Sequence, residues 1–432
     1  MKFRYHYFLY QLFVMFALPV FGQNKYFDKQ IKRLASSEFH GRGYTNNGMD
    51  KTSKYLAKEL KRLGVKPLND NYFQTFTFPI NIIQNSKLEI NGKLLTYGKD
   101  YILKPSSKSI SYTPSVQNYI LDTEAYITSF QSKQKTIEFI KSDFEQQRDK
   151  HVILPSLNTS VDSIRNYYKQ WANTYENTDN TRRAVFRFVA DSLTASLSQR
   201  QSGITEFIIK EKYFSDSLEI TNYEVKAFHD SAFSFNNVIG IIEGQNKDSI
   251  IVISAHYDHL GKVGEMYFPG ASDNASGTAM VLDLAKYYVK KKPKYSIAFM
   301  FFGAEEAGIV GALKYVENPL FPLKKIKFLV NLDIMGAGED GIQIVNGTKY
   351  THQFNQMVDI NNKNKYLKEV KVRGESCNSD HCPFDRKGVP SFFIYTLGGK
   401  GNYHNIYDTY ENLDLSYSPQ VKSLLIDFID QL

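Results

Sequence analysis

The segment YSIAFMFFGAEE, from Tyr295 to Glu306, joins an unbroken apolar run to two adjacent glutamates. An apolar run of this length without alternation is typical of a strand that is buried on both faces in a parallel sheet. Adjacent like charges repel each other and Glu is disfavoured in strands, so neither propensity nor packing accounts for Glu305 and Glu306. Taken alone, such a pair is most simply interpreted as the polar tip of a loop. The surrounding sequence decides whether the two glutamates belong to a functional site.

Strand-like and helix-like patterns alternate on both sides of this segment, from residue 236 to the C-terminus. Helix-like amphipathic patterns occupy residues 276–292, 307–318 and 418–432. Strands that alternate with helices predict an α/β fold with a mostly parallel central sheet flanked by helices. The other strand-like apolar runs lie at 236–244, 248–256, 325–336, 341–347 and 389–396.

Side chains that can bind metal follow these predicted strands at the points where the strands end. Because ligands of α/β proteins bind beyond the carboxyl ends of the strands, these side chains are expected at one edge of the sheet. Two imidazoles and three carboxylates can hold two zinc ions, with one carboxylate shared between them. The side chains in question are His256, Asp258, Asp273, Glu305, Glu306, Asp333 and His404, and the two histidines with three of the five carboxylates would suffice for the two ions.

The glutamate pair suits such a centre because neighbouring side chains point in different directions. One glutamate can bind metal while the other serves as general base. Asp258 stands two residues after His256, and such positions face the same side of an extended chain, so its carboxylate can accept the free N–H of that histidine. His259 is interpreted as a bystander. The sequence contains neither the G-x-S-x-G motif of serine hydrolases nor a glycine-rich phosphate-binding loop.

Five motifs, SAHYDHLG, PGASDNASGTAMVL, FFGAEEAGIVGA, NLDIMG and YHNIYDTYENLD, occur in this order between residues 236 and 432. They resemble the motifs of the di-zinc peptidase family that includes secreted bacterial leucine aminopeptidases, aminopeptidase Y and glutamate carboxypeptidase. The resemblance implies a zinc exopeptidase fold and two zinc ions per chain. It implies a bridging Asp273, the ligands His256, Glu306, Asp333 and His404, Glu305 as general base, and Asp258 orienting His256.

The activity implied by the resemblance is that of an aminopeptidase, which hydrolyses N-terminal residues from peptides through a metal-bridging water. The same resemblance implies that His256 shares an ion with Glu306 and Asp333 with His404, and that the Asp273–Asn274 peptide bond is cis. Two alternatives stay open. SDHCPFDRKGVP and ENLD are also similar to glutaminyl cyclases, which form N-terminal pyroglutamate with one zinc, and a non-catalytic peptide-binding relative would keep the same fold.

The stretch from residue 81 to residue 230 differs in composition, with short strand-like runs and many Ser, Asn and Gln. We expect an inserted mixed α/β domain here, and a catalytic domain formed by residues 23–80 and 231–432. The position of the insertion resembles that of the protease-associated domain of many relatives, although no motif of that domain is present.

The N-terminus has a basic start and an apolar run from about residue 8 to residue 21, which predicts a signal peptide over residues 1–22. We therefore expect an exported protein, periplasmic or extracellular, without an integral membrane span after signal removal. The net charge of +8 is scattered over 432 residues and no nucleic-acid-binding motif is present, so peptides and not nucleic acids are the expected partners. Cys377 and Cys382 form either one short disulfide or two free thiols. The sequence leaves the oligomeric state undetermined.

Overall fold

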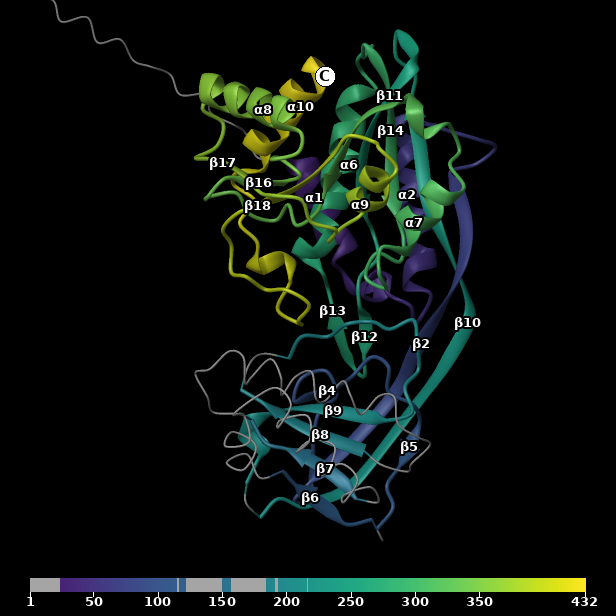
Figure 1. Ribbon diagram of the computed structural model, residues 1–432, viewed down its shortest axis with the longest axis vertical. Helices are drawn as coiled ribbons and strands as arrows, with labels where there is room; N and C mark the ends of the chain where they lie inside the picture. The colour runs from purple at the N-terminus through teal and green to yellow at the C-terminus, as the bar shows by residue number, and fades with distance from the viewer. Residues whose placement is uncertain (1–23, 115, 122–149, 157–183, 191–192, 216) are drawn as a thin grey trace, which may run out of the picture.

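The structure is a computed structural model that describes residues 24–114, 116–121, 150–156, 184–190, 193–215 and 217–432 (Figure 1). The expected signal peptide, residues 1–22, lies outside this part of the chain. An α/β domain and a smaller domain lie at opposite ends of two long paired strands, β2 (Phe73–Ile90) and β10 (Ile220–Ile242).

The α/β domain is built on a sheet with the strand order β17-β16-β18-β15-β11-β14-β10-β2-β3. Its four central strands are mutually parallel, which confirms the predicted fold class. Antiparallel pairs flank this centre, because β16 pairs with β18 on one side and β10 with β14 on the other. The strands are β11 (Asn246–His256), β14 (Tyr295–Phe302), β15 (Ile326–Leu332), β16 (Ile342–Val345), β17 (Val370–Val372), β18 (Ser391–Thr396) and β3 (Lys93–Leu94).

Helices cover both faces of this sheet because successive residues of its buried strands point to opposite sides. In β11, Ile251 and Ile253 belong to one hydrophobic core, whereas Ile250 and Val252 belong to the other. Helices α7 (Val310–Glu317) and α9 (His381–Arg386) pack on the second face. The first face carries α1 (Lys25–Leu34), α2 (Gly48–Leu63), α6 (Gly277–Tyr288), α8 (Thr351–Asn364) and α10 (Ser418–Gln431).

In its described residues, the smaller domain contains a five-stranded sheet that packs against the distal halves of β2 and β10 (Figure 1). Its core contains the stacked rings of Phe186 and Phe207 together with Tyr223 of β10. The strand order is β4 (Tyr101–Leu103), β9 (Thr205–Lys210), β8 (Ala184–Val189), β7 (His151–Leu154) and β6 (Asn118–Ile120).

The expected domain boundaries, 80/81 and 230/231, both fall inside the long strands. Ile80 of β2 pairs with Asp230 of β10, and the pairing of the two strands extends to both sides of this point. The two domains therefore share one two-stranded ribbon, because neither strand ends where the composition changes, although the pairing shifts register between Asp230 and Phe233.

Two further sequence questions are answered by the fold. Cys377 and Cys382 are joined in a disulfide, which selects one of the two expected states of these residues. In the described part of the chain, no helix combines the length and apolar character that crossing a bilayer requires.

Candidate metal centre

Three of the predicted ligand-bearing loops begin at the carboxyl ends of neighbouring parallel strands. His256 is the last residue of β11 and lies level with Phe302, the last residue of β14. Ser254 of β11 is paired with Asn331 of β15, so Asp333 falls level with His256 on the other side. The register of the sheet therefore brings His256, the turn that carries Glu305, and Asp333 to one edge.

Asp273 lies between two histidines that come from distant parts of the sequence. Its Oδ1 is 3.3 Å from Nε2 of His256, and its Oδ2 is 3.1 Å from Nε2 of His404. The side chain of Asp273 is almost fully buried. A carboxylate whose two oxygens face two different imidazoles has the arrangement that a bridging metal ligand needs.

Each of the remaining two predicted ligands contacts one of these two histidines. Oδ1 of Asp333 lies 3.2 Å from Nε2 of His256, and Oε2 of Glu306 lies 3.0 Å from Nε2 of His404. The structure therefore groups Asp333 with His256 and Glu306 with His404, whereas the resemblance implied the crossed pairs. All five predicted ligands nevertheless gather in one cluster, in two groups that share Asp273.

His259, which the sequence pattern alone does not mark as a ligand, also belongs to this cluster. Its Nδ1 lies 2.6 Å from Oε1 of Glu306, and its side chain is fully buried. Its ring is 5.6 Å from that of His404 at a steep angle. His259 follows the strand after a non-periodic turn, so the only sequence signal for it was the repetition of His in HYDH.

The cluster fits zinc by the chemistry of its donors. Imidazole nitrogens and carboxylate oxygens are the donors that zinc takes from His, Asp and Glu. The buried Nε2 atom of His259 has no hydrogen-bond partner among the described residues, and Nε2 of His404 faces the carboxylate oxygens of Asp273 and Glu306. A buried polar atom without a partner is costly, and a metal ion would remove that cost. The two groups that can each hold an ion are His256, Asp273 and Asp333, and His259, Asp273, Glu306 and His404.

Asp258 holds the turn that carries the glutamate pair. Its Oδ1 accepts a 3.0 Å hydrogen bond from the main-chain N–H of Glu305, and its Oδ2 accepts one of 3.3 Å from that of Glu306. Nδ1 of His256 lies 3.3 Å from the main-chain oxygen of Asp258 and 3.8 Å from its carboxylate. The expected contact with His256 is therefore made by the main chain, while the carboxylate binds the Glu305–Glu306 turn.

The loop that carries Asp273 is fixed from two sides. Arg42 is fully buried and its guanidinium donates to the main-chain oxygens of Leu34, Tyr257, Pro269, Gly270 and Asp273. The carboxylate of Asp408 accepts hydrogen bonds of 2.8 and 3.0 Å from the N–H groups of Ser272 and Asp273. The Asp273–Asn274 peptide bond is cis, as the resemblance implied.

Space for Arg42 depends on a glycine. Gly270 has a φ of 54°, in the left-handed region that favours glycine. A Cβ atom there would lie 2.2 Å from the main-chain oxygen of Asp273 and 2.6 Å from Nη2 of Arg42. Any other residue at this position would therefore displace the loop or the guanidinium.

The surroundings shift the pKa values of two carboxyl groups in the cluster in opposite directions. Burial, together with the negative charges of Asp380 and Glu306, raises the pKa of Glu305 well above its usual range, although His256 acts against this. Burial also disfavours the charged form of Asp273, but hydrogen bonds with His256 and His404 hold the pKa of this carboxyl well below its usual range. In this arrangement Asp273 is suited to bind a cation, and Glu305 to take up and release a proton.

The cluster forms the floor of an open cavity of about 280 Å³. Tyr403, whose ring stacks on that of His404 at 3.8 Å between centroids, forms part of its wall. Asp380 and His381 are buried behind the cavity, and neither of them lines it. The other wall residues are Ile334, Arg373, Asn378, Phe393 and Tyr395.

Known proteins are similar to this chain in both sequence and fold. A probable leucine aminopeptidase of Trichophyton verrucosum is 27% identical over 220 residues, which are 45% of this chain and 55% of that protein. Aminopeptidase YwaD of Bacillus subtilis is 28% identical over 207 residues, 46% of this chain and 44% of that protein. The chain thus spans about half of the length of these curated relatives.

Two solved structures share the fold over almost the whole chain. A zinc aminopeptidase from Bacillus subtilis superposes with a TM-score of 0.66 at 19% identity, and each chain is covered to 94%. A peptidase M28 precursor from Shewanella amazonensis gives a TM-score of 0.65 at 17% identity, with 94% of this chain and 96% of that chain covered. Residues 237–429 match the model of peptidase family M28, a range that contains every ligand candidate of the cluster.

Proposed function

We propose that the protein is a zinc-dependent aminopeptidase that binds two zinc ions and removes N-terminal residues from peptides. The observation that carries the proposal is the position of Asp273, whose two carboxylate oxygens face His256 and His404. His256 and Asp333 would hold one ion, and His404 and Glu306 the other. The names of the curated relatives and the family of residues 237–429 support the same activity.

The two ions supply Lewis-acid chemistry when bound, polarising a scissile carbonyl and making water more acidic. Glu305 lines the cavity beside the ligands, and its main-chain N–H is fixed by Asp258. It takes the proton from the attacking water and later passes it to the leaving amine, and its raised pKa suits this exchange. Asp258 and Arg42 contribute indirectly, because they hold the loops that position Glu305, Glu306 and Asp273.

The location that we propose for the protein rests on the N-terminal sequence. A signal peptide over residues 1–22 would export the chain, and the peptides it cleaves would then be those of the periplasm or the medium. Comparison of the N-terminus of the cell-associated and exported protein by mass spectrometry tests this. A mature chain that begins at Gln23 is expected, and an intact residue 1 in the exported fraction would contradict it.

The enzyme assay uses the mature, zinc-loaded protein and peptides with free or acetylated N-termini. We expect stepwise loss of N-terminal residues, which stops when the amine is acetylated or when the metal is chelated. Glu305→Gln should lower kcat by roughly 10²- to 10⁴-fold while the zinc content stays at two ions. Glu265→Gln, at a side chain that is 90% exposed and pairs with Lys262, serves as the matched control. Wild-type turnover in Glu305→Gln would overturn the assignment of the base, and release of ammonia from a Gln-initiated peptide without chain shortening would indicate a cyclase.

A further inference from the structure

The wall of the catalytic cavity carries a charge that the proposed chemistry does not use. Arg373 is the only Lys or Arg among the described residues that line this cavity. The floor is formed by carboxylates and imidazoles, which the proposed function assigns to the two zinc ions and to the base. Arg373 therefore faces the space where the substrate must lie.

The position of Arg373 is defined by its neighbours at the sheet edge. It directly follows β17, and its main-chain N–H donates to the main-chain oxygen of Ile344 at 2.8 Å. Its Nη1 donates to the hydroxyl of Tyr395 at 3.1 Å, and that hydroxyl donates to Oε1 of Gln343 at 2.9 Å. One of the five guanidinium N–H donors is thereby used to orient the group.

The acids nearest to Arg373 in the sequence are paired with other cations. Glu375 Oε2 lies 3.1 Å from Lys349 Nζ, and Glu369 Oε2 lies 3.5 Å from Lys371 Nζ. Within the described ranges of the chain, Arg373 makes no ion pair of its own. A guanidinium at the wall of a cavity, held by one neutral hydrogen bond, is a preformed partner for a carboxylate.

We propose that Arg373 selects peptides that carry a carboxylate within one residue of the scissile bond. The cavity of about 280 Å³ is at the small end of the range for ligand pockets, so it holds a residue or two and not a long segment. The positive charge of Arg373 repels the protonated amino terminus of the substrate, so this amino terminus lies away from that wall. The carboxylate is then either the side chain of an N-terminal Asp or Glu or the free C-terminus of a dipeptide.

This proposal rests on the proposed function, and its test separates the two. The zinc-loaded protein is assayed with two matched peptide pairs: Glu-Ala-Ala-amide with Gln-Ala-Ala-amide, and Leu-Ala with Leu-Ala-amide. Release of the shortened product gives kcat/KM for each. We expect the acidic member of at least one pair to be cleaved about 10-fold or more faster, and the pair that shows it identifies the source of the carboxylate.

Arg373→Gln should reduce that ratio to about one, because the glutamine side chain is polar but carries no charge. Lys371→Gln, two residues earlier on the exposed strand β17, should leave the ratio unchanged. Cleavage of all four peptides without preference, or a preference that survives in Arg373→Gln, would overturn the role of Arg373 and leave the aminopeptidase standing. Cleavage of none would overturn the proposed function.

A measurement without turnover decides the role of Arg373 in either case. Thermal unfolding of the zinc-loaded protein is recorded with L-glutamate, L-glutamine, and the carboxylate-bearing dipeptide D-Leu-D-Ala against its amide. A larger increase in Tm with the carboxylate member of a pair, lost in Arg373→Gln and kept in Lys371→Gln, supports the carboxylate subsite. Equal shifts with both members of each pair in the wild-type protein contradict it.

Discussion

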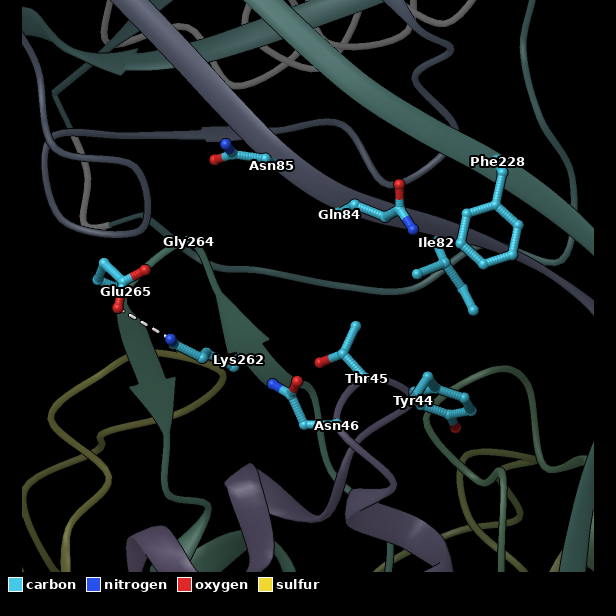
Figure 2. Close-up of a pocket in the computed structure, with 10 residues that line it drawn as sticks. All are labelled: Tyr44, Thr45, Asn46, Ile82, Gln84, Asn85, Phe228, Lys262, Gly264 and Glu265. Carbon is cyan, nitrogen blue, oxygen red and sulfur yellow. Dashed lines mark hydrogen bonds and ion pairs between the residues drawn. The ribbon is translucent and has the colours of Figure 1, made fainter.

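The hydroxyl of Tyr44 donates a 2.7 Å hydrogen bond to Oδ2 of Asp258, the carboxylate that holds the main chain of Glu305 and Glu306. Tyr44 lies in the loop before α2, and it also lines a second cavity of about 530 Å³ between β2, β10 and the hairpin of β12 (Gly261–Val263) and β13 (Met266–Phe268) (Figure 2). Tyr44 thus supports the turn that carries Glu305, the proposed general base, through its hydrogen bond with Asp258.

Tyr44→Phe removes only this hydroxyl, so we expect a loss in the catalytic step with zinc content unchanged. Asp258 is fully buried and would lose one of its three donors, which costs about 1–3 kcal/mol of unfolding free energy. A roughly 10-fold fall in kcat with little change in KM is expected, since the turn of Glu305 loosens. Tyr72→Phe is the control, because its hydroxyl bonds only the main-chain oxygen of Val65. An equal effect of both variants on kcat would contradict the prediction.

His259 is expected to increase the affinity for the zinc ion that Glu306 and His404 hold. Its Nδ1 contacts the Glu306 oxygen that faces away from His404, so it fixes which oxygen remains for the metal. His259→Ala should lower the affinity for one of the two zinc ions by roughly 10- to 100-fold, as measured by competition with a chelator. His259→Asn places an amide near the Nδ1 position and should recover most of the affinity, whereas His259→Gln should not. Two ions bound as tightly in His259→Ala as in the wild type would refute this role.

Much of the site was predictable because parallel strands end at a common edge. The apolar runs that became β11, β14 and β15 placed His256, Glu305 and Asp333 together without knowledge of the strand order. The pairing of ligands was not predictable in the same way. It depends on the position of the loop after β18. There the main-chain oxygen of His404 accepts a hydrogen bond from the N–H of Ala195, a residue of the inserted segment, and Nδ1 of His404 contacts the main-chain oxygen of Ala195.

The domain boundaries could not be located from amino-acid composition. The composition changes near residues 80 and 230 because the chain packs against a different core there, whereas β2 and β10 continue through these positions. Phe78 and Phe235 face the α/β core, and Leu88 and Val225 face the core of the smaller domain, all on the same two strands. Helices α1 and α8 were not predicted. The periodicity of α8 is weak because the helix lies within a polar stretch, whereas α1 is strongly amphipathic but directly follows the predicted signal peptide.

Replacement of Arg42 should destabilise the fold and the metal centre together. Arg42→Lys leaves a single ammonium where a planar guanidinium reaches five main-chain oxygens, so several buried acceptors lose their donor. We expect the free energy of unfolding in urea to fall by at least about 3 kcal/mol, and zinc to bind more weakly because the Asp273 loop is less fixed. Arg62→Lys, at a half-exposed residue paired with Glu59, should change neither quantity by more than about 1 kcal/mol.

The metal-free protein should become less stable as the pH rises from about 6.5 toward 10. Burial lowers the pKa of His404, but its contacts with Asp273 and Glu306 outweigh this and raise the pKa from 6.5 to about 10. A histidine that binds its proton more tightly when folded stabilises the protein fully below pH 6.5, and this stabilisation, on the order of a few kcal/mol, disappears as the pH passes the folded value.

Urea unfolding of the chelator-treated protein at pH 6, 8 and 10 measures this loss, and His404→Gln provides the matched variant. The difference in unfolding free energy between wild type and His404→Gln should be largest at pH 6 and shrink toward pH 10. Zinc should reverse the trend, because a metal ion binds the deprotonated imidazole and therefore stabilises the protein more at higher pH. A difference that stays constant across this range without metal would show that the protonated form of His404 does not contribute to folding.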